Sequence, residues 1–280
     1  MINEKILVPV DFSECSINAL KVAIDMTNRL GSDLIILHAY HLSVVEGQYG
    51  VGVLAERLAK DKRNMIEAEF KILEEEVPEL SSVTYELLSR HGSVEDEVMS
   101  MSEATKIHMV IMGTKGVSGI EEVLIGSNAY SVIKKTKVPV ILIPEGGSLK
   151  NIKSIALAGD YKPLETHTLD MLKELTQVYD AEVYIIHIDD DAVLETSEIN
   201  QAVKYEEILK GVRYHYRLLT GKNVEEGIRD YCETNEIDLL AIVPRKQQLF
   251  EAIFGLSETK KIVFHTQLPV LILPETKQLL

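Results

Sequence analysis

The sequence predicts an α/β protein of two tandem domains, each a five-stranded parallel sheet with helices on both faces. Three observations lead to this prediction. The chain has 280 residues, which is enough for two ordinary domains. Short apolar runs alternate along it with amphipathic stretches. The elements of the first half then recur in the second half in the same order.

The expected strands of the first half are short apolar runs, which are typical of parallel strands buried on both faces. The first of them, ILVPV, is followed directly by Asp11. The five runs occupy residues 6–10, 34–40, 83–89, 107–112 and 140–143. Because a helical stretch separates most neighbouring runs, the order predicts a parallel sheet with right-handed crossovers.

Capping residues and apolar periodicity mark the helices between these strands. Asp11 and Ser13 are candidate caps for the first helix, and Gly31 is placed to end it. A long charged helix over 58–76 is expected to turn an apolar stripe toward the sheet. This stripe comprises Met65, Ile66, Phe70 and Leu73. The remaining expectations are helices over 94–105 and 127–135 and an irregular loop over 41–56.

The second half repeats the first at two fixed offsets. Asp11 and Asp160 lie 149 residues apart, whereas Pro139 and Pro269 lie 130 apart. The offset therefore changes once, by 19 residues, and this places extra chain of the first half between 41 and about 60. Two offsets that hold across many positions indicate a duplicated domain.

Glycines and a serine at 146–148 join the two copies, so we expect domains at 1–147 and 148–280. The formal charge of −15 is shared evenly, with −8 on the first 148 residues and −7 on the rest. This balance argues against nucleic acid or an anionic membrane as the main partner. Cys15 and Cys232 form no CxxC pair, and no apolar run approaches the roughly 18 residues of a membrane span. We therefore expect a cytoplasmic protein.

Candidate site residues gather in the loop GTKGVSGIEEVLIGSN after the fourth expected strand. Gly113, Gly116 and Gly126 would let backbone N–H groups turn toward a phosphate, because glycine tolerates positive φ and has no Cβ. Ser127 would begin a helix whose dipole favours negative charge at the same place. Asp11, at the end of the first strand, is placed to accept hydrogen bonds from ribose hydroxyls.

The alternative interpretation is that these glycines only form tight turns. The full spacing, with a serine after the last glycine and an aspartate after the first strand, favours the anion site. The loop lacks the Gly-Lys-Ser/Thr of a Walker A motif and the GxGxxG of dinucleotide-binding proteins. An ordinary P-loop NTPase and a dinucleotide dehydrogenase are therefore excluded.

Two other residue types, histidine and cysteine, have plain structural interpretations. His38 and His41 suggest a metal site, but a separation of three along a strand puts them on opposite faces. His38 and its repeat His187 more simply end buried strands. Cys15 lacks a local basic cluster that would lower its pKa, so we expect a structural cysteine and not a redox thiol.

The motif Gly113-x2-Gly116-x9-Gly126-Ser127 resembles the nucleotide motif of the universal stress protein family. The opening KILVPVDFSECSINAL and the later segments LGSDLIILHAY and KVPVILIP resemble this family as well. The likeness covers both halves, so the chain is similar to a tandem, UspA-like member with Rossmann-like domains. The resemblance implies ATP, or AMP or ADP, as the ligand, with or without Mg. The residues implied are Pro9, Val10, Ala39 and Met112 around adenine, Asp11 at the ribose, and Gly113, Lys115, Gly116, Gly126, Ser127 and Asn128 along the phosphates.

The resemblance also implies pairing through the last strands. In this chain the segments from Val140 to Ile143 and from Val270 to Leu273 would form an intrachain pseudo-dimer. A homodimer of whole chains is a further expectation.

The second half departs from the glycine pattern at an offset of 130 residues. Gly113, Gly116 and Gly126 are replaced there by Val243, Lys246 and Leu256, respectively, and Ser127 by Ser257. Valine cannot easily adopt positive φ, and Leu256 would put a side chain where a phosphate should approach. We therefore expect one nucleotide site per chain, in the first half.

Three functions remain open at this point. The protein is a nucleotide-binding regulatory module, a slow ATP hydrolase, or a dimeric scaffold that works without nucleotide. Hydrolysis needs a positioned base, and no clear base lies near the loop, because Glu121 and Glu122 fit a solvated face equally well. The regulatory module is favoured, with no catalytic residue and no metal ligand assigned.

Overall fold

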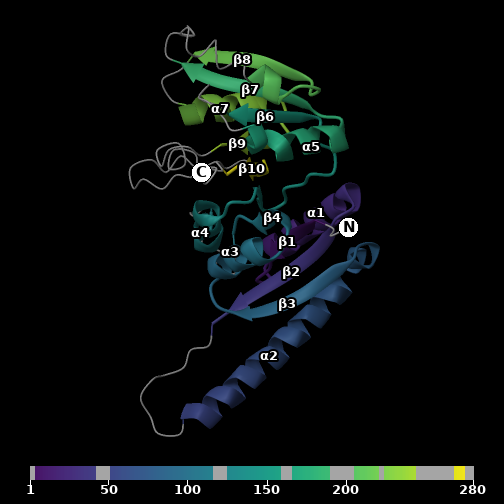
Figure 1. The fold of residues 1–280 in the computed structure, drawn as a ribbon, viewed down its shortest axis with the longest axis vertical. Helices are drawn as coiled ribbons and strands as arrows, with labels where there is room; N and C mark the ends of the chain where they lie inside the picture. The colour runs from purple at the N-terminus through teal and green to yellow at the C-terminus, as the bar shows by residue number, and fades with distance from the viewer. Residues whose placement is uncertain are drawn as a thin grey trace.

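A computed structural model describes residues 4–41, 51–115, 125–158, 166–189, 205–220, 224–243 and 268–274. In its first half, strands and helices alternate as expected from the sequence (Figure 1). The elements are β1 (Lys5–Pro9), α1 (Glu14–Leu30), β2 (Asp33–Tyr40), α2 (Val51–Glu76), η1 (Pro78–Ser82), β3 (Tyr85–His91), α3 (Val94–Ala104), β4 (Ile107–Gly113), α4 (Ser127–Lys135) and β5 (Val140–Ile143).

The second half repeats this order of strands. Its elements are β6 (Ser154–Ala158), η2 (Thr166–Leu169), α5 (Asp170–Tyr179), β7 (Glu182–Asp189), β8 (Tyr214–Thr220), α7 (Val224–Thr234), β9 (Leu239–Ile242) and β10 (Val270–Ile272). Several parts of the chain that carry predictions lie outside the described residues: Asp160 and the ranges 42–50, 116–124 and 244–267.

All ten described strands form one sheet in the order β3-β2-β1-β4-β5-β10-β9-β6-β7-β8. Each neighbouring pair is parallel except β5 and β10, which pair antiparallel. At this central pair, Val140 faces Ile272 and Leu142 faces Val270. The sheet thus consists of two five-stranded parallel sheets that meet edge to edge at their last strands.

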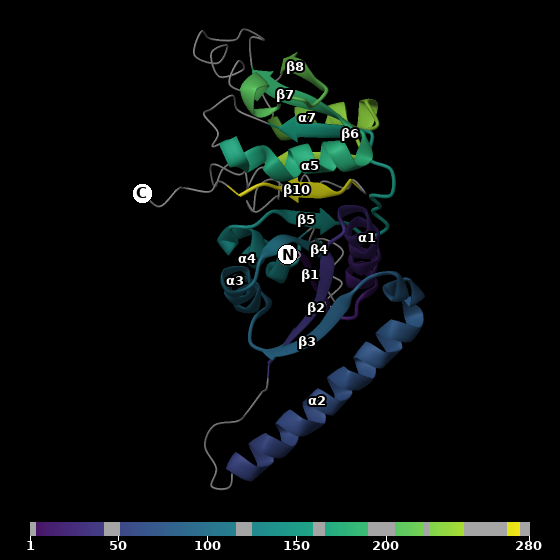
Figure 2. The ribbon, with the colours of Figure 1, turned by 45° about the vertical axis from the view of Figure 1, so that its right-hand side comes forward.

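Helices cover both faces of the sheet, which confirms the predicted α/β class (Figure 2). Successive strand residues pack on opposite faces, so Ile6 and Val8 join one apolar core and Leu7 joins the other. All three side chains are fully buried. Helices α1, α2 and α5 pack on the face of Ile6, and α3, α4 and α7 on the face of Leu7. Each core runs through both halves.

Local capping explains why α1 begins and ends where it does. The Ser13 side chain accepts a hydrogen bond from the Ser16 N–H at 3.3 Å, and Gly31 ends the helix with a φ of 64°. Of the two expected caps, Ser13 is the cap residue. Asp11 instead accepts hydrogen bonds from Ser13.

Helix α2 differs from the prediction in two ways. It begins at Val51, so residues 51–56 of the expected loop are helical. Ile66, Phe70 and Leu73 are buried as predicted, but Met65 is 61% exposed. The prediction was wrong at Met65 because it is the immediate neighbour of Ile66, and adjacent helical residues point about 100° apart.

The segment that joins the halves is packed against the first half. Asn18 on α1 donates its side-chain amide to the Gly147 carbonyl at 2.9 Å. Leu149 and Ile152, which follow, are buried in the core of the Ile6 face. The halves are therefore connected by a segment that contributes to the core.

Candidate functional site

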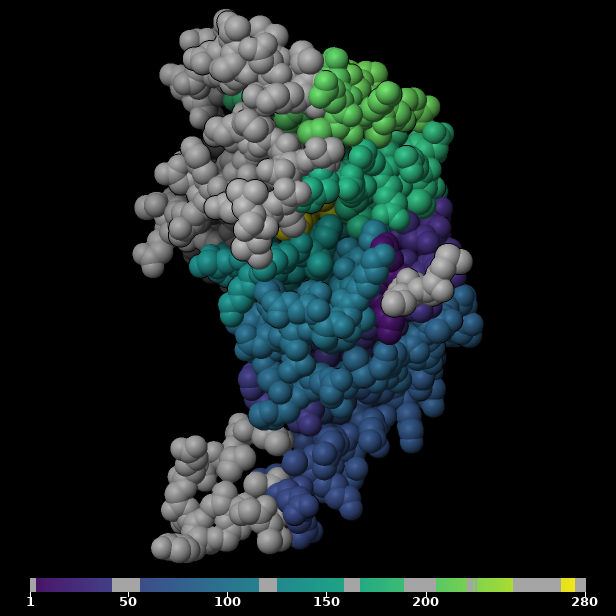
Figure 3. All heavy atoms as spheres, viewed as in Figure 1, coloured from purple at the N-terminus to yellow at the C-terminus, as the bar shows by residue number. Residues whose placement is uncertain are grey.

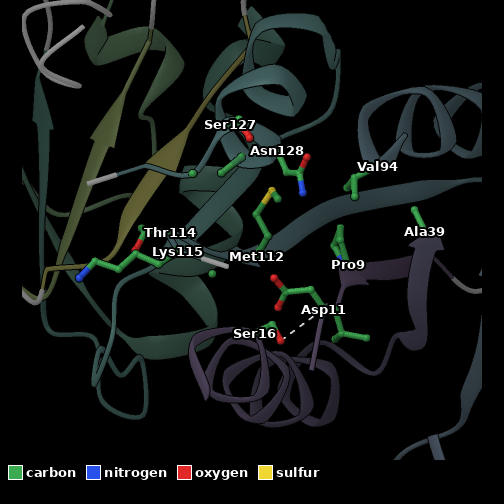
Figure 4. Close-up of a pocket in the computed structure, with 14 residues that line it drawn as sticks. Pro9, Asp11, Ser16, Ala39, Val94, Met112, Thr114, Lys115, Ser127 and Asn128 are labelled. Atoms are coloured by element: carbon green, nitrogen blue, oxygen red, sulfur yellow. Dashed lines mark hydrogen bonds between the residues drawn. The ribbon is translucent and has the colours of Figure 1, made fainter. Parts of the chain in front are cut away.

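A cavity opens at the carboxyl ends of β1 and β4, the two central strands of the first half (Figure 4). β1 pairs with β2 on one side and with β4 on the other. The chain leaves these strands toward opposite faces, because α1, which follows β1, and α4, which follows β4, belong to different cores. This reversal of strand order is where doubly wound α/β proteins place their ligands.

The cavity has a volume of about 170 Å³. Every predicted site residue that the structure describes lines it: Pro9, Val10, Asp11, Ala39, Met112, Gly113, Lys115, Gly126, Ser127 and Asn128. The remaining predicted residue, Gly116, lies outside the described residues. The structure adds four residues to the lining: Ser16, Val94, Thr114 and Ala129.

Asp11 is held in place by the residues that start α1. One of its carboxylate oxygens, Oδ1, accepts hydrogen bonds from the Ser13 N–H at 3.1 Å and the Ser13 hydroxyl at 2.6 Å. The Asp11 N–H points to the Ser16 hydroxyl at 3.4 Å (Figure 4). The turn thus presents an oriented carboxylate to the cavity, and carboxylate oxygens are acceptors for hydroxyl groups.

A strained residue follows Asp11. Phe12 has a φ of 63°, which a non-glycine residue rarely adopts. Its ring is held between His38, with centroids 4.7 Å apart, and Phe70 at 5.5 Å. Backbone strain of this kind costs about 1–3 kcal/mol and occurs often at ligand sites. The contacts of the Phe12 ring with His38 and Phe70 hold Phe12 in this conformation and thereby stabilise the turn that orients Asp11.

His38 stabilises the chain just after β1 by a hydrogen bond to Val10. Its Nδ1 lies 2.9 Å from the Val10 carbonyl oxygen, so Nδ1 carries the proton that is donated. Burial lowers the pKa of His38, which favours the neutral ring. The Val10 N–H is also used, since it donates to the Leu37 carbonyl at 2.8 Å. Val10 therefore lines the cavity while its backbone N–H and carbonyl are already hydrogen-bonded to Leu37 and His38.

The N-terminus of α4 opens into the cavity without a side-chain cap. Its cap residue is Gly126, and the next three residues, Ser127, Asn128 and Ala129, line the cavity. The first N–H groups of a helix have no partner within the helix. In α1 and α3 a serine side chain caps this end. At α4 the N–H groups and the positive end of the helix dipole are available to an anion.

The loop between β4 and α4 is closed at its base. The Gly126 N–H donates to the Thr114 carbonyl at 2.6 Å, and the Thr114 N–H donates to the Ile143 carbonyl at 3.0 Å. These bonds bring the start of α4 next to the end of β4. Thr114 was missed by sequence reasoning, although its place directly after Gly113 is a signal that could have identified it.

The two described glycines of the motif do not have the positive φ that the sequence suggested. Gly126 has φ −61° and ψ 153°. The φ of Gly113 is not positive either. Gly113 is needed for another reason: a Cβ there would lie 2.9 Å from the Cys15 sulfur and 3.0 Å from its carbonyl carbon. Close packing of β4 against α1 thus excludes a side chain at this position.

The same geometry changes the expectation for Val243, which replaces Gly113 in the second half. Because Gly113 itself has no positive φ, the φ preference of valine does not distinguish the two halves. Val243 is buried. The counterparts of Gly116, Gly126 and Ser127 lie outside the described part of the second half.

Lys115 contributes its stem to the cavity while its ammonium group is paired elsewhere. The Lys115 Nζ lies 3.6 Å from the Glu145 Oε2. In Figure 4 its charged end points away from Asp11 and Asn128. Glu145 follows β5 and was not predicted to belong to the site. The pair is partly exposed, so the lysine can be redirected at small cost.

The opposite side of the cavity is apolar. Pro9 and Ala39 come from the ends of β1 and β2, Met112 from β4, and Val94 from the start of α3. Val94 was missed because it follows β3, an edge strand. The signal was present, since the first residue of each crossover helix lies at the same sheet edge as the strand ends. The cavity therefore has an apolar wall, a carboxylate and a helix N-terminus.

The ionisable side chains among the described lining residues are Asp11 and Lys115. No group of three or more His, Cys, Asp or Glu in the described ranges could hold a metal ion. No helix within those ranges is long and apolar enough to cross a membrane. His38, His187 and Cys15 are placed in or beside the cores, and the Cys15 thiol contacts the Ile143 carbonyl oxygen at 3.5 Å.

The fold and the cavity define a doubly wound α/β protein with a ligand-type cavity at its switch point. A profile of the Universal stress protein family matches residues 3–144, slightly more than half of the 280 residues. The chain belongs to the universal stress protein family.

Individual relatives support this assignment. The chain is 27% identical to Universal stress protein YxiE of Bacillus subtilis (strain 168) over 144 residues, which are 50% of this chain and 97% of that protein. It is also 27% identical to Universal stress protein MJ0531 of Methanocaldococcus jannaschii over 143 residues, 50% of this chain and 81% of that protein. Both relatives therefore match about half of the chain.

A solved structure extends the likeness to both halves. The crystal structure of a universal stress protein from Archaeoglobus fulgidus DSM 4304 has a TM-score of 0.70 and 18% identity, covering 98% of this chain and 97% of that one. At this level of identity the likeness concerns the fold. The arrangement of two joined parallel sheets thus recurs in a universal stress protein of similar length.

Proposed function

We propose that the first half binds one adenine nucleotide per chain and that its occupancy serves as a regulatory signal. The observation that carries this proposal is the uncapped N-terminus of α4, which opens into the same cavity as Asp11. An anion-binding group and a hydroxyl acceptor thus share one cavity with an apolar wall. This combination fits a ligand with phosphate, sugar and base, and ATP is the favoured ligand, with AMP and ADP as alternatives.

Each part of the nucleotide has a matching group. The base lies against the apolar wall formed by Pro9, Ala39, Val94 and Met112. The ribose hydroxyls donate to Asp11. The phosphates accept hydrogen bonds from the N–H groups of Ser127 and Asn128, where the helix dipole favours negative charge. Gly126 leaves the space that a phosphate needs to approach this end, and Gly116 is assigned the same role from the sequence.

Lys115 pairs with the phosphates that lie farthest from the ribose. Its partly exposed pairing with Glu145 at 3.6 Å is exchanged for a pairing with phosphate when a nucleotide binds. A divalent cation such as Mg would accompany the polyphosphate. AMP, with one phosphate, gains less from this lysine than ATP does.

The second half, residues 148–280, is assigned a structural role. At the described positions, Pro9 and Gly113 are replaced by Ala158 and Val243. The substitutions to Lys246 and Leu256, outside the described residues, remove the other glycines of the motif. The antiparallel pair of β5 and β10 supports the view that this half acts as the partner of residues 1–147 in an intrachain pseudo-dimer.

Hydrolysis of ATP is the weaker alternative. A hydrolase needs a base that activates water next to the γ-phosphate. Asp11 already accepts two hydrogen bonds from Ser13, and Lys115 is a cation. We therefore expect turnover below about 1 s⁻¹, the low end of typical enzymes.

Isothermal titration calorimetry with ATP and AMP tests the proposal. We expect about one nucleotide bound per chain, with heats that vanish in Gly126→Val because two methyl groups then block the approach to α4. Leu256→Gly is the matched control, as it restores a glycine at the repeated position without the rest of the motif, and it should leave one site. Mass spectrometry of ligand released from purified protein identifies which adenine nucleotide is preferred.

Other outcomes contradict parts of the proposal. Two equivalent sites would refute the assignment of the second half, and absence of binding would favour a scaffold that works without nucleotide. Phosphate release faster than about 1 s⁻¹ in the same preparations would favour a hydrolase.

A further inference from the structure

Large apolar side chains are exposed at four positions among the described residues, and three of these lie on α2. Leu58, Met65 and Ile72 are 44%, 61% and 48% exposed, and the fourth, Val224, lies on α7 in the second half. Isolated exposed apolar residues are common on protein surfaces. A row of them on one helix requires an explanation, because apolar surface is stabilised by removal from water.

The three side chains form a line along α2. They are spaced seven residues apart, which is about two helical turns, so each lies nearly above the previous one. The line runs beside the buried stripe of Ile66 and Leu73 on the same helix. We call Leu58, Met65 and Ile72 the exposed stripe.

The exposed stripe belongs to a part of the molecule that extends away from the sheet. Helix α2 has 26 residues, about 39 Å in length, and its first turns project beyond β3 in both ribbon views (Figures 1 and 2). The space-filling view shows the same projection at the lower end of the molecule (Figure 3). The start of this helix falls in the 19 residues that the first half has in excess of the second.

We propose that the exposed stripe of α2 pairs with α2 of a second copy of this chain, with the two helices antiparallel. The stripe is symmetric about Met65, since Leu58 and Ile72 are seven residues before and after it. A two-fold axis at Met65 places Leu58 against Ile72 of the second copy, and Met65 against its own counterpart. Such self-complementarity is what a two-fold interface requires.

Charges beside the stripe complement each other in the antiparallel arrangement. Lys62 and Glu69 flank the stripe on one side, and neither forms an ion pair with another described residue. In the antiparallel arrangement Lys62 lies across from Glu69 of the second copy, and the reverse pair forms by symmetry. On the other side Asp61 meets the small, uncharged Ala68. No like charges face each other.

In a parallel arrangement the two-fold axis runs along the helices, so Lys62 would face Asp61 of the second copy and Glu69 would face Ala68. Both arrangements therefore pair opposite charges, and cross-linking distinguishes them. An anionic membrane is disfavoured as an occupant of the stripe, because the chain carries a net charge of −15.

Sedimentation equilibrium of the full chain, over concentrations up to about 1 mM, tests whether the stripe forms a dimer. We expect a reversible dimer. Met65→Glu should raise its dissociation constant at least about tenfold, because two carboxylates would then meet at the two-fold axis. Val224→Glu is the matched control: it also replaces an exposed apolar side chain by a carboxylate, but on α7, and should leave the dissociation constant unchanged. A monomer at all concentrations, or a dimer that survives Met65→Glu, overturns the proposal.

Cysteine cross-linking tests the direction of pairing. The native cysteines, Cys15 and Cys232, are both buried, so the parent chain should not cross-link. Met65→Cys should form a disulfide dimer on mild oxidation. Leu58→Cys alone should not, because its counterpart is displaced by 14 residues, about 21 Å, whereas a disulfide requires Cα atoms within about 7 Å.

A mixture of chains separates the two arrangements further. Leu58→Cys mixed with Ile72→Cys should give the mixed disulfide dimer. Cross-linking of Leu58→Cys alone as fast as Met65→Cys indicates parallel or random contact, and this overturns the antiparallel arrangement.

Discussion

Gly113 lies where β4 passes closest to the start of α1. A Cβ at this position would contact the Cys15 sulfur at 2.9 Å and its carbonyl carbon and oxygen at 3.0 Å each. Backbone atoms cannot move aside as a flexible side chain can. The absence of a side chain here is therefore a packing requirement that exists without any ligand.

We expect Gly113→Ala to lower the free energy of unfolding by about 1–3 kcal/mol, the usual cost of overpacking. Urea denaturation of the ligand-free protein measures it. Adding Cys15→Ala should recover only part of the loss, because the backbone contacts of residue 15 remain. Unchanged stability in Gly113→Ala would show that the glycine is needed for ligand approach alone.

For single residues, the position in the cavity could be predicted from the sequence more readily than the backbone conformation. The position of Ser127 followed from the glycine motif and that of Asp11 from the end of the first strand, and both residues line the cavity. The φ values of Gly113 and Gly126 could not be inferred, because a glycine is compatible with several backbone conformations and only the surrounding packing selects one. Val94 was missed because its contribution depends on where β3 ends in space.

At the scale of elements, α4 is the helix whose start distinguishes the site. Its first turn has neither a side-chain cap nor an acidic residue, whereas α3 has Ser93 as its cap and three acidic residues in its first turn. Acidic groups there stabilise a helix by interacting with its dipole. Their absence from α4 leaves this end for a negatively charged ligand.

Asn128→Asp separates the stability of α4 from its role in binding. The substitution preserves side-chain shape and places a negative charge in the first turn, so the ligand-free protein should gain about 0.3–1 kcal/mol in unfolding free energy. The same charge repels phosphate, and affinity for ATP and AMP should fall at least about tenfold. Thermal unfolding and calorimetry measure the two effects.

Adenosine provides the control for this variant. It carries no phosphate, so its binding to the Asn128→Asp protein should match that to the parent chain. Equal losses for adenosine and AMP would mean that the N-terminus of α4 does not face the phosphate.

The boundaries of elements could be predicted where a local signal exists. Helix α4 and strand β5 have the predicted bounds, and α1 ends at the predicted Gly31. Helix α2 begins seven residues before the prediction, since no capping residue marks its start. The exposure of Met65 depends on which flank of α2 faces the sheet, and two neighbouring apolar stripes left this undecided.

At the scale of the whole molecule, the two halves are joined by more than the central strand pair. Arg29 on α1 lies over the ring of Tyr179 on α5, with its guanidinium carbon 4.9 Å from the ring centroid. Burial raises the pKa of Tyr179 to about 12, so this ring remains neutral. Such contacts could not be predicted, because they depend on how the halves are oriented.

His108 on β4 forms a second bridge between the halves. Its Nε2 lies 2.6 Å from the Glu174 Oε2 on α5, and its Nδ1 lies 2.8 Å from the Glu4 Oε2, a carboxylate that also pairs with Lys106. Carboxylates only accept hydrogen bonds, so both contacts are satisfied when the imidazole is protonated. The hydrogen bond with Glu174 raises the pKa of His108 above its ordinary value, and burial partly opposes this shift.

The bridge should make stability depend on pH. Because the folded-state pKa of His108 is raised, its contribution is fully present below the unfolded-state value of about 6.5 and is lost as the pH rises through the folded-state value. We expect His108→Gln to reduce the free energy of unfolding by about 1–3 kcal/mol near pH 6, the range for hydrogen bonds to charged groups. The difference should shrink toward pH 9. Urea denaturation across this range measures it.

His215→Gln provides the control for this pH dependence. His215 contacts Glu182 at 3.2 Å within the second half, but its side chain is 44% exposed, and exposed pairs contribute little. The stability of this variant should follow that of the parent chain at every pH. If His108→Gln also loses the same free energy at pH 6 and pH 9, the bridge does not depend on protonation, and His108 joins the halves as a neutral ring.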